Sequence, residues 1–179
     1  SNEKEIIPNC DIIILCMPVS KYRLALNRIG KYLSKDKDIY IGTIYGGQAG
    51  FNWMVEEMKN KYKITNIVSF AYLLIPWVCR AIDYGKVGVT WGSKEINIVA
   101  VSPSKYFDYL NEVLFENISF NWFNKGRAIQ SENFISLTLS GDNQLIHTSR
   151  CYGLFNKSGG KWKSLEEVPY MYKDYDDYS

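Results

Sequence analysis

An unbroken apolar run at residues 12–18, IIILCMP, most constrains what this chain can fold into. A continuous run of β-branched residues that ends in proline is typical of a parallel strand buried on both faces. Apolar residues at helical spacing then predict a helix over residues 21–33. Further strands are predicted at residues 39–44 and 64–70, with a helix at residues 51–61 between them. This alternation predicts a parallel α/β sheet with right-handed crossovers.

The pattern changes after residue 71. Two apolar segments, residues 87–91 and 96–101, are separated by Gly-Ser-Lys-Glu and predict a hairpin. Ser104 is predicted to cap a helix over residues 104–114. The polar residues 124–127 indicate a boundary close to Gln130, which divides the chain into residues 1–130 and 131–179.

Charge and cysteine content exclude several classes of protein. The net charge is +2 with both signs interspersed, so the basic stripe of a nucleic-acid-binding protein is missing. The cysteines at positions 10, 16, 79 and 151 form no CxxC pair, and we expect reduced, buried thiols in a cytoplasmic protein. The longest apolar run is too short for a membrane span, and no signal peptide is visible. The acidic residues at 174–177 are interpreted as a solvated face, and no metal site is predicted.

Glycines follow the second predicted strand. Ligands of open parallel sheets bind at the carboxyl ends of the strands, where Cys16, Met17 and Pro18 follow the first strand. Gly46 and Gly47 follow the second strand and let the backbone approach a ligand, while the amide of Gln48 suits a carboxylate or a ribose. A tight turn without a ligand explains these glycines equally well. No GxGxxG motif occurs in the chain.

The stretch 131–155 contains the only histidine, His147, four places after Asn143. Its apolar spacing predicts a helix with Ser131 or Asn133 as N-cap. If that helix continues to His147, the two side chains stand one turn apart on one side. An imidazole that exchanges a proton near neutral pH, beside an amide, suits carbonyl reduction. On spacing alone, a structural or surface histidine is the more common alternative.

Several motifs together resemble the opine dehydrogenases, and the octopine dehydrogenases in particular. In chain order, the likeness lies in the LIPWVCR run at 74–80, the Tyr-Gly pair at 84–85, the WGSK run at 91–94, the NxxxH motif at 143–147, and the tyrosine-rich segments 168–172 and 175–179. The combination of the PWVCR run with NxxxH carries most of this resemblance.

The resemblance implies an NADH-dependent enzyme, with NADPH as an open alternative. Residues 1–130 would be part of a Rossmann domain, and residues 131–179 the beginning of an all-helical catalytic domain. The implied reaction condenses an amino acid with an α-keto acid such as pyruvate. His147 would be the general acid/base and Asn143 its neighbour. The candidate coenzyme contacts are those at the strand ends, Cys16, Met17, Pro18, Gly46 and Gly47, and the candidate substrate contacts are Gln48, Leu73, Leu74, Cys79 and Arg150. An ordinary salt bridge or a solvated side chain is an equally good explanation for Arg150.

The same resemblance implies that segments of the enzyme lie outside these residues. The glycine-rich nucleotide loop would precede Ser1, and the aspartate that orients the histidine would follow Ser179. We therefore expect a piece truncated at both ends, inactive by itself, from a monomer or homodimer. Its partners would be small molecules rather than nucleic acid or membrane.

Two positions depart from the family pattern. Leu73 stands where an acidic residue receives the guanidinium of arginine, and a leucine offers nothing to a cation. A smaller or apolar amino acid, or taurine, is therefore the expected amine. Thr148 replaces a proline after the histidine, with little expected effect. Two alternatives stay open: a reductase of a single keto or hydroxy acid, and a non-catalytic protein that retains the fold.

Overall fold

The structure is a computed structural model that describes residues 2–47, 50–119 and 126–169. Within these residues a five-stranded sheet has the order β1-β2-β3-β6-β7. The strands are β1 (Ile12–Ile14), β2 (Ile39–Thr43), β3 (Ile67–Tyr72), β6 (Ile96–Ser102) and β7 (Arg127–Gln130). The first three run parallel, β6 is antiparallel to β3, and β7 is parallel to β6. The predicted α/β class with a mainly parallel sheet is confirmed.

Short and long helices alternate with these strands. They are α1 (Glu3–Ile6), η1 (Ile7–Asn9), η2 (Val19–Lys21), α2 (Tyr22–Gly30), α3 (Phe51–Tyr62), η4 (Ser104–Tyr106), α4 (Phe107–Leu110), η5 (Asn111–Phe115), α5 (Glu116–Ser119), α6 (Phe134–Leu139), α7 (Asn143–Ser158) and η6 (Leu165–Glu167). The predicted helices at 21–33 and 51–61 correspond to α2 and α3. Among the described helices, none has the length and apolar character needed to cross a membrane.

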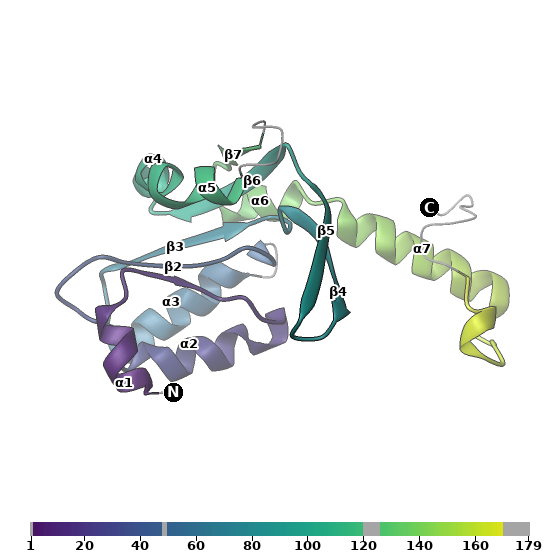
Figure 1. The fold of residues 1–179 in the computed structure, drawn as a ribbon, viewed down its shortest axis with the longest axis horizontal. Helices are drawn as coiled ribbons and strands as arrows, with labels where there is room; N and C mark the ends of the chain where they lie inside the picture. The colour runs from purple at the N-terminus through teal and green to yellow at the C-terminus, as the bar shows by residue number, and fades with distance from the viewer. Residues whose placement is uncertain (1, 48–49, 120–125, 170–179) are drawn as a thin grey trace. The chain divides into compact units, whose positions relative to one another are not determined.

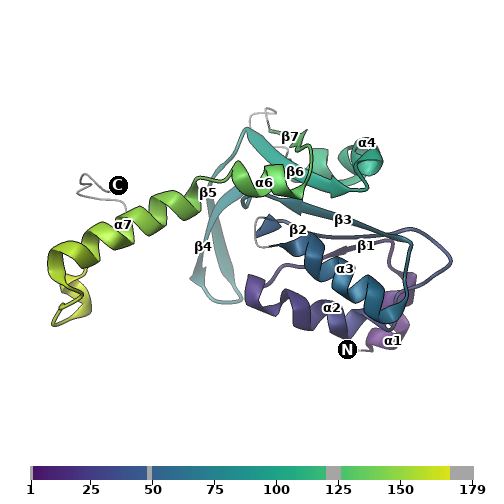
Figure 2. The same ribbon diagram turned by 180° about the vertical axis from the view of Figure 1, so that it is seen from behind.

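The sheet lies between two helical layers. Successive side chains of a strand point to opposite faces, so each central strand packs against both layers. Helices α2 and α3 lie on one face of the sheet and the helical segment α4–α5 on the other (Figure 1, Figure 2). On the first face, Ile39, Ile41 and Ala71 pack with apolar residues of α2, α3 and α6. On the second face, Tyr40, Phe70 and other residues pack with the helical segment α4–α5. Each fully buried large apolar side chain contributes roughly 1.5–3 kcal/mol to folding. These two cores fix the strand ends that carry the candidate site.

The first strand differs from its prediction. β1 is only three residues long, and all three isoleucines are partly rather than fully buried. It has β2 on one side and no second neighbour among the described strands. The apolar run therefore predicted the strand and its parallel direction, but burial on both faces was wrong for an outer strand.

The predicted hairpin was also wrong. The hairpin is formed by β4 (Trp77–Asp83) and β5 (Val87–Ser93), which turn at Gly85 with φ +74°. Strand β6, predicted to pair with residues 87–91, instead joins β3 in the central sheet. The physical reason is burial: Val99, Ala100 and Val101 gain two helical layers beside β3, which a two-stranded hairpin does not offer.

The helical prediction at 131–147 is correct in part. Asn133 is the N-cap of α6, and its Oδ1 accepts a hydrogen bond from the amide of Ser136 at 2.8 Å. The helix does not run through to His147, because α6 ends at Leu139 and α7 begins at Asn143. The prediction that Ser104 caps a helix was wrong: Ser104 is the first residue of η4, with no side-chain cap.

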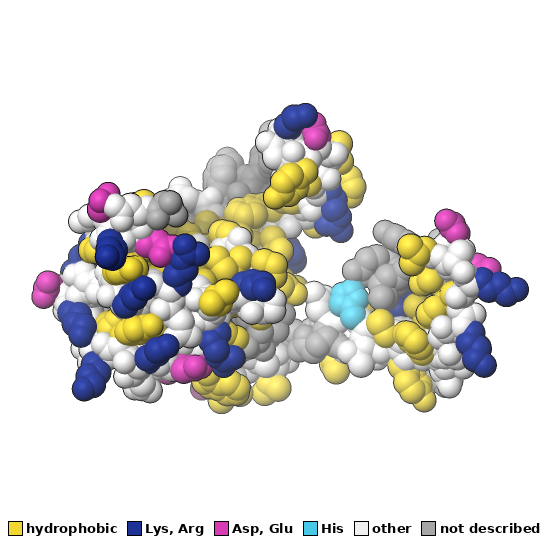
Figure 3. Space-filling view, turned by 90° about the horizontal axis from the view of Figure 1, so that it is seen from below, with side chains coloured by type: hydrophobic (Ala, Val, Ile, Leu, Met, Phe, Trp, Pro, Cys, Tyr) yellow, Lys and Arg dark blue, Asp and Glu magenta, His cyan; other side chains and the backbone are white. Residues whose placement is uncertain are grey.

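The chain divides into two compact units, residues 1–140 and 141–179. Helix α6 belongs to the first unit, where Phe134 and Leu137 are part of the core. The predicted domain boundary near Gln130 stays a prediction. On the face shown in Figure 3, Lys and Arg side chains are interspersed with Asp and Glu.

The cysteines are free, as predicted, but their predicted burial was wrong. Cys16, Cys79 and Cys151 are exposed and Cys10 is partly buried. Cys16 follows the end of a strand and Cys79 lies in the exposed hairpin. The apolar residues next to them in the sequence therefore do not bury their thiols.

Candidate functional site

The parallel strands β1, β2 and β3 bring three predicted segments to one edge of the sheet. Their carboxyl ends meet there because the strands share one direction. Cys16, Met17 and Pro18 follow β1 and are exposed to solvent. The turn with Gly46 and Gly47 follows β2, and Leu73 and Leu74 follow β3. Gln48, also predicted for this edge, lies outside the described residues.

Packing links the three segments at the two glycines. A Cβ atom on Gly46 would lie 2.7 Å from Cγ2 of Val19, just after the first segment, and the residue has φ +85°. A Cβ atom on Gly47 would lie 2.6 Å from Leu137 and 2.9 Å from the carbonyl oxygen of Tyr72. All three distances are shorter than real Cβ contacts, so a side chain at either glycine would push the turn away from its neighbours.

A buried hydroxyl network lies beneath this turn. The hydroxyl of Tyr22 is 2.6 Å from Thr43 Oγ1 and 2.6 Å from the carbonyl oxygen of Tyr45. Thr43 Oγ1 is 2.7 Å from the same carbonyl oxygen and accepts from the amide of Tyr45 at 3.2 Å. Sequence reasoning missed this pair, because Tyr22 fits the apolar stripe of its helix and periodicity carries no signal for a hydrogen bond.

The predicted substrate residues of the first unit occupy different environments. Leu73 is 6% exposed and belongs to the core, while Leu74 packs against that core from outside. Cys79 is exposed on β4, with its Sγ 3.4 Å from Oγ1 of Thr90. Among these three, Cys79 is the side chain most open to a ligand.

Lys94 forms two hydrogen bonds at the base of the β4–β5 hairpin, close to the end of β3. Its amide donates to the carbonyl oxygen of Pro76 at 2.8 Å, and its ammonium group donates to the carbonyl oxygen of Ile75. Burial lowers the pKa of the Lys94 ammonium group. The WGSK resemblance included this lysine, but the sequence alone gave it no role.

The second unit holds the residues predicted for catalysis. Asn143 and His147 are both partly buried and stand one turn apart on α7. Arg150, one turn further, is 2% exposed. An imidazole, an amide and a guanidinium group on one helix offer a proton donor, a hydrogen-bonding group and an anion-binding group. Their roles stay predictions.

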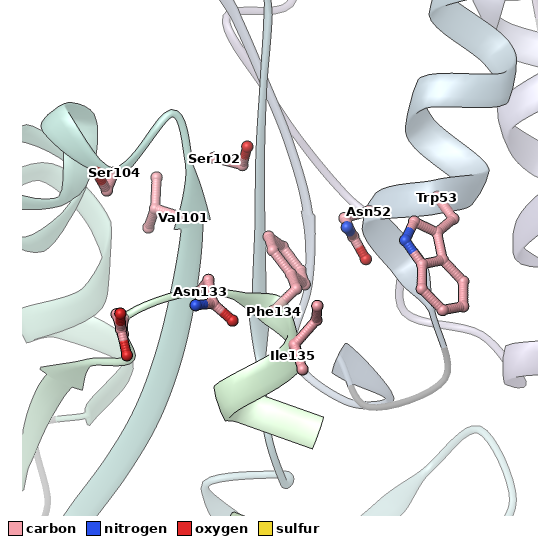
Figure 4. A pocket seen from close by; sticks show the side chains of 9 residues that line it. Asn52, Trp53, Val101, Ser102, Ser104, Asn133, Phe134 and Ile135 are labelled. Carbon is pink, nitrogen blue, oxygen red and sulfur yellow. The ribbon is translucent and has the colours of Figure 1, made fainter. Parts of the chain in front are cut away.

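A cavity of about 340 Å³ lies elsewhere on the first unit (Figure 4). It is lined by the first turn of α3, the end of β6 and the start of α6: Asn52, Trp53, Val101, Ser102, Ser104, Glu132, Asn133, Phe134 and Ile135. Its polar groups are the hydroxyls of two serines, the amides of two asparagines, the indole N–H of Trp53 and the carboxylate of Glu132. Among these residues, the sequence predicted roles only for Ser104 and Asn133, both as helix caps.

Within the described ranges, no group of three or more His, Cys, Asp or Glu residues is placed to hold a metal ion. The acidic cluster at 174–177 lies outside these ranges.

Comparison with known proteins relates this geometry to characterised enzymes. No protein-family model matches the chain. The chain is 28% identical over 183 residues to an opine dehydrogenase from Haliotis discus hannai, a match that covers 96% of the chain. It is 23% identical over 164 residues to the uncharacterised protein y4xO from Sinorhizobium fredii (strain NBRC 101917 / NGR234), covering 88% of the chain. The matched part is 40% of each relative, so this chain spans well under half of their length.

Solved structures of octopine dehydrogenase share the fold. The complex with NADH and L-arginine matches 90% of this chain at a TM-score of 0.66 and 15% identity. The complex with NADH and pyruvate matches 89% at a TM-score of 0.64, also at 15% identity. Each match covers 38% of the octopine dehydrogenase chain. The chain is thus similar in sequence to an opine dehydrogenase, and it shares its fold with octopine dehydrogenase.

Proposed function

We propose that the protein containing this chain is an NAD(P)H-dependent opine dehydrogenase. The observation that carries the proposal is the similarity to an opine dehydrogenase along 96% of the chain, which includes the NxxxH motif now seen on α7. In the proposed reaction, an α-keto acid and an amino acid lose water to form an imine. A hydride and a proton then reduce the imine to a secondary amine. NADH is the proposed coenzyme because the similar octopine dehydrogenases were solved with it.

The carboxyl edge of the first unit is the proposed coenzyme contact. Exposed residues 16–18 and the glycine turn lie where open parallel sheets bind nucleotides, so the residues present fit this role. The turn places backbone rather than side chains at this edge. NADH, when bound, supplies the hydride. The chain contains no GxGxxG motif for the pyrophosphate, and we expect these 179 residues alone to bind NADH weakly and to be inactive.

The second unit supplies the proposed proton chemistry. His147 protonates the oxygen that leaves as water, and Asn143 hydrogen-bonds the substrate beside it. Arg150 pairs with a substrate carboxylate, for which a guanidinium group has matching geometry. A general acid of this kind typically contributes ~10²–10⁴-fold to the rate.

The amine substrate is proposed to be small or apolar, or taurine. The side chain of Leu73 is uncharged and 6% exposed, so this position offers no partner to a guanidinium group. Arginine occurs in one of the similar octopine dehydrogenase structures. The family resemblance implies an acidic residue for arginine at the position that Leu73 occupies here.

The test uses the natural full-length protein. NADH oxidation should require both a keto acid and an amino acid. His147→Ala should lower kcat by about 10²-fold or more while the protein stays folded. Ser149→Ala, an exposed position on the same helix, is the matched control and should retain kcat. Turnover with the keto acid alone would favour a simple reductase, and unchanged turnover in His147→Ala would exclude the proposed mechanism.

A further inference from the structure

Tyr22 contacts both ends of the glycine-rich turn. At the start of the turn, its hydroxyl is hydrogen-bonded to the carbonyl oxygen of Tyr45 at 2.6 Å. At the end, its ring packs edge-on against Phe51, the first residue of α3, with ring centroids 5.5 Å apart. Between them, Gly46 lies against the Tyr22 ring, since a Cβ atom there would be 3.5 Å from Cε2. One side chain from α2 therefore touches the turn at three points.

Thr43 completes this support from the last position of β2. Its hydroxyl is 3.2 Å from the carbonyl oxygen of Leu15, at the end of β1, and 2.7 Å from that of Tyr45. Tyr22 is 1% exposed and Thr43 is 0% exposed, so water does not compete for these bonds. The network thus joins the ends of two parallel strands, the helix α2 and the turn.

The number of hydroxyl protons limits which hydrogen bonds Tyr22 and Thr43 can donate. Two protons are available, one from Tyr22 and one from Thr43. If Tyr22 donates to the Tyr45 carbonyl, that carbonyl is bonded and Thr43 can donate to the Tyr22 oxygen. If Tyr22 donates to Thr43, then Thr43 can donate to the Tyr45 carbonyl at 2.7 Å or to the Leu15 carbonyl at 3.2 Å, and the shorter distance favours Tyr45. Burial also raises the pKa of the Tyr22 hydroxyl, which keeps it a donor.

We infer that Tyr22 and Thr43 are positioning residues that hold the backbone of residues 45–47 in the shape the coenzyme contacts. This inference rests on the proposed function, because it takes that turn as part of the NADH site. Neither side chain touches the ligand; both act through the Tyr45 carbonyl and Gly46. Loosening the turn should weaken coenzyme binding and leave the chemical step almost unchanged.

The experiment compares variants of the natural full-length protein in steady-state kinetics. Tyr22→Phe removes one hydroxyl and should raise KM for NADH by about 2- to 10-fold, which corresponds to one hydrogen bond. Its kcat should stay within about twofold. Thr43→Val should act in the same direction, and Thr43→Ser, which retains the hydroxyl, should restore KM. The double variant Tyr22→Phe/Thr43→Val should exceed the sum of the single changes in free energy, because the carbonyl then loses both donors.

Tyr62→Phe is the matched control. The Tyr62 hydroxyl donates to the carbonyl oxygen of Asn27 at 2.7 Å, so the substitution removes an equivalent tyrosine–backbone bond between α3 and α2, away from the turn. Its KM for NADH should stay within about twofold. An equal rise of KM in the Tyr62 and Tyr22 variants would overturn the inference, since general loosening would then explain both. An unchanged KM in Tyr22→Phe would also overturn it.

A second measurement separates this inference from the proposed function. Amide hydrogen exchange at Gly46 and Gly47 should be faster in Tyr22→Phe than in Tyr62→Phe. If wild-type protein shows no NADH-dependent turnover, the proposed function fails, and the coenzyme part of the inference fails with it. If turnover is normal but exchange is unchanged in Tyr22→Phe, the inference alone fails.

Discussion

Strands β2 and β3 and strands β4 and β5 have similar apolar sequences and opposite surroundings. Every residue of β2 and β3 is buried, whereas every residue of β4 and β5 is exposed or partly exposed. No residue of the hairpin belongs to either core cluster. Helical layers on both faces make this difference, and within the described residues the hairpin has none. Apolar composition therefore indicates a strand. Whether that strand contributes to the free energy of folding depends on the helices that pack against it.

The same comparison separates fold from the candidate function. The central strands contain the residues that determine the fold, while the PWVCR motif behind the family resemblance runs into the exposed hairpin. An isolated two-stranded hairpin is marginally stable, and Lys94 joins the two ends of this one through hydrogen bonds to residues 75 and 76. Substitutions in the two regions should thus differ in kind as well as in size.

The largest difference in the free energy of unfolding is expected between substitutions of a buried and of an exposed aromatic residue. Phe115 is fully buried and meets Phe70, Tyr72 and Phe107 at centroid distances of 5.4, 5.6 and 5.7 Å. Phe115→Ala should lower the free energy of unfolding by about 3–5 kcal/mol. Trp91 on β5 is 66% exposed, and Trp91→Ala should cost less than about 1 kcal/mol. Urea denaturation measures both, and similar costs would break the comparison.

Alkaline pH should distinguish a core tyrosine from a hairpin tyrosine. Burial raises the pKa of Tyr72 to about 12, from 10.0. Below pH 10 neither the folded nor the unfolded chain ionises this group. Between pH 10 and about 12 only the unfolded chain loses the proton, so stability falls by about 1.4 kcal/mol per pH unit, on the order of 2–3 kcal/mol in all.

Tyr72→Phe should remove that part of the pH dependence. Within the described part of the chain, the Tyr72 hydroxyl lacks hydrogen-bond geometry to any partner, although Ser119 lies near it, so the substitution should cost little at pH 7. Tyr84→Phe, at the 95% exposed hairpin tip, is the control and should leave the profile unchanged. Identical profiles for wild type and Tyr72→Phe would contradict the prediction.

Two strand glycines give a smaller contrast. A Cβ atom on Gly42 of β2 would lie 2.2 Å from the ring of Phe70, whose side chain is fully buried. Gly42→Ala should therefore destabilise the protein by roughly 1–3 kcal/mol through overpacking. No atom lies within 4 Å of the corresponding position on Gly88 of β5, and Gly88→Ala should change stability by less than about 0.5 kcal/mol. Thermal denaturation of both variants, at one protein concentration, is the measurement.

The smallest effect on stability is expected at Cys79. Cys79→Ser alters an exposed side chain whose Sγ contacts Thr90 Oγ1 at 3.4 Å, so unfolding should change by less than about 0.5 kcal/mol. KM for the amino acid should nevertheless change, because Cys79 is a predicted substrate contact. A large loss of stability with an unchanged KM would show that the hairpin is a packing element.

Sequence periodicity predicted the elements whose apolar spacing is visible within a short stretch of sequence. Helices α2 and α3 and strand β2 follow from apolar spacing, and Asn133 as a cap follows from its short polar side chain. The pairing of β5 and β6 was wrong because both are apolar and only a short polar segment separates them. That local pattern does not reveal that β6 gains more by pairing with β3, which lies more than twenty residues earlier.

The candidate site was predictable only in part for a related reason. The glycines and the NxxxH motif can be recognised in the sequence. The glycines follow β2, at the predicted strand end, whereas NxxxH lies on a separate helix, α7, that begins at Asn143. The hydroxyl pair of Tyr22 and Thr43 joins residues 21 positions apart, and only the fold brings it together. Its effect on the turn depends on distances, which residue types do not encode.

The two hydrogen bonds of Lys94 to residues 75 and 76 join the two ends of the hairpin, and this anchored end lies close to the end of β3. At the opposite end, nothing lies within 4 Å of a Cβ atom on Gly85, and Asp83 and Lys86 close the turn through a 3.0 Å backbone bond. Extra chain added there would extend into solvent without disturbing the anchored end. The tip between Asp83 and Lys86 is therefore a suitable insertion point for an epitope or a fluorescent label.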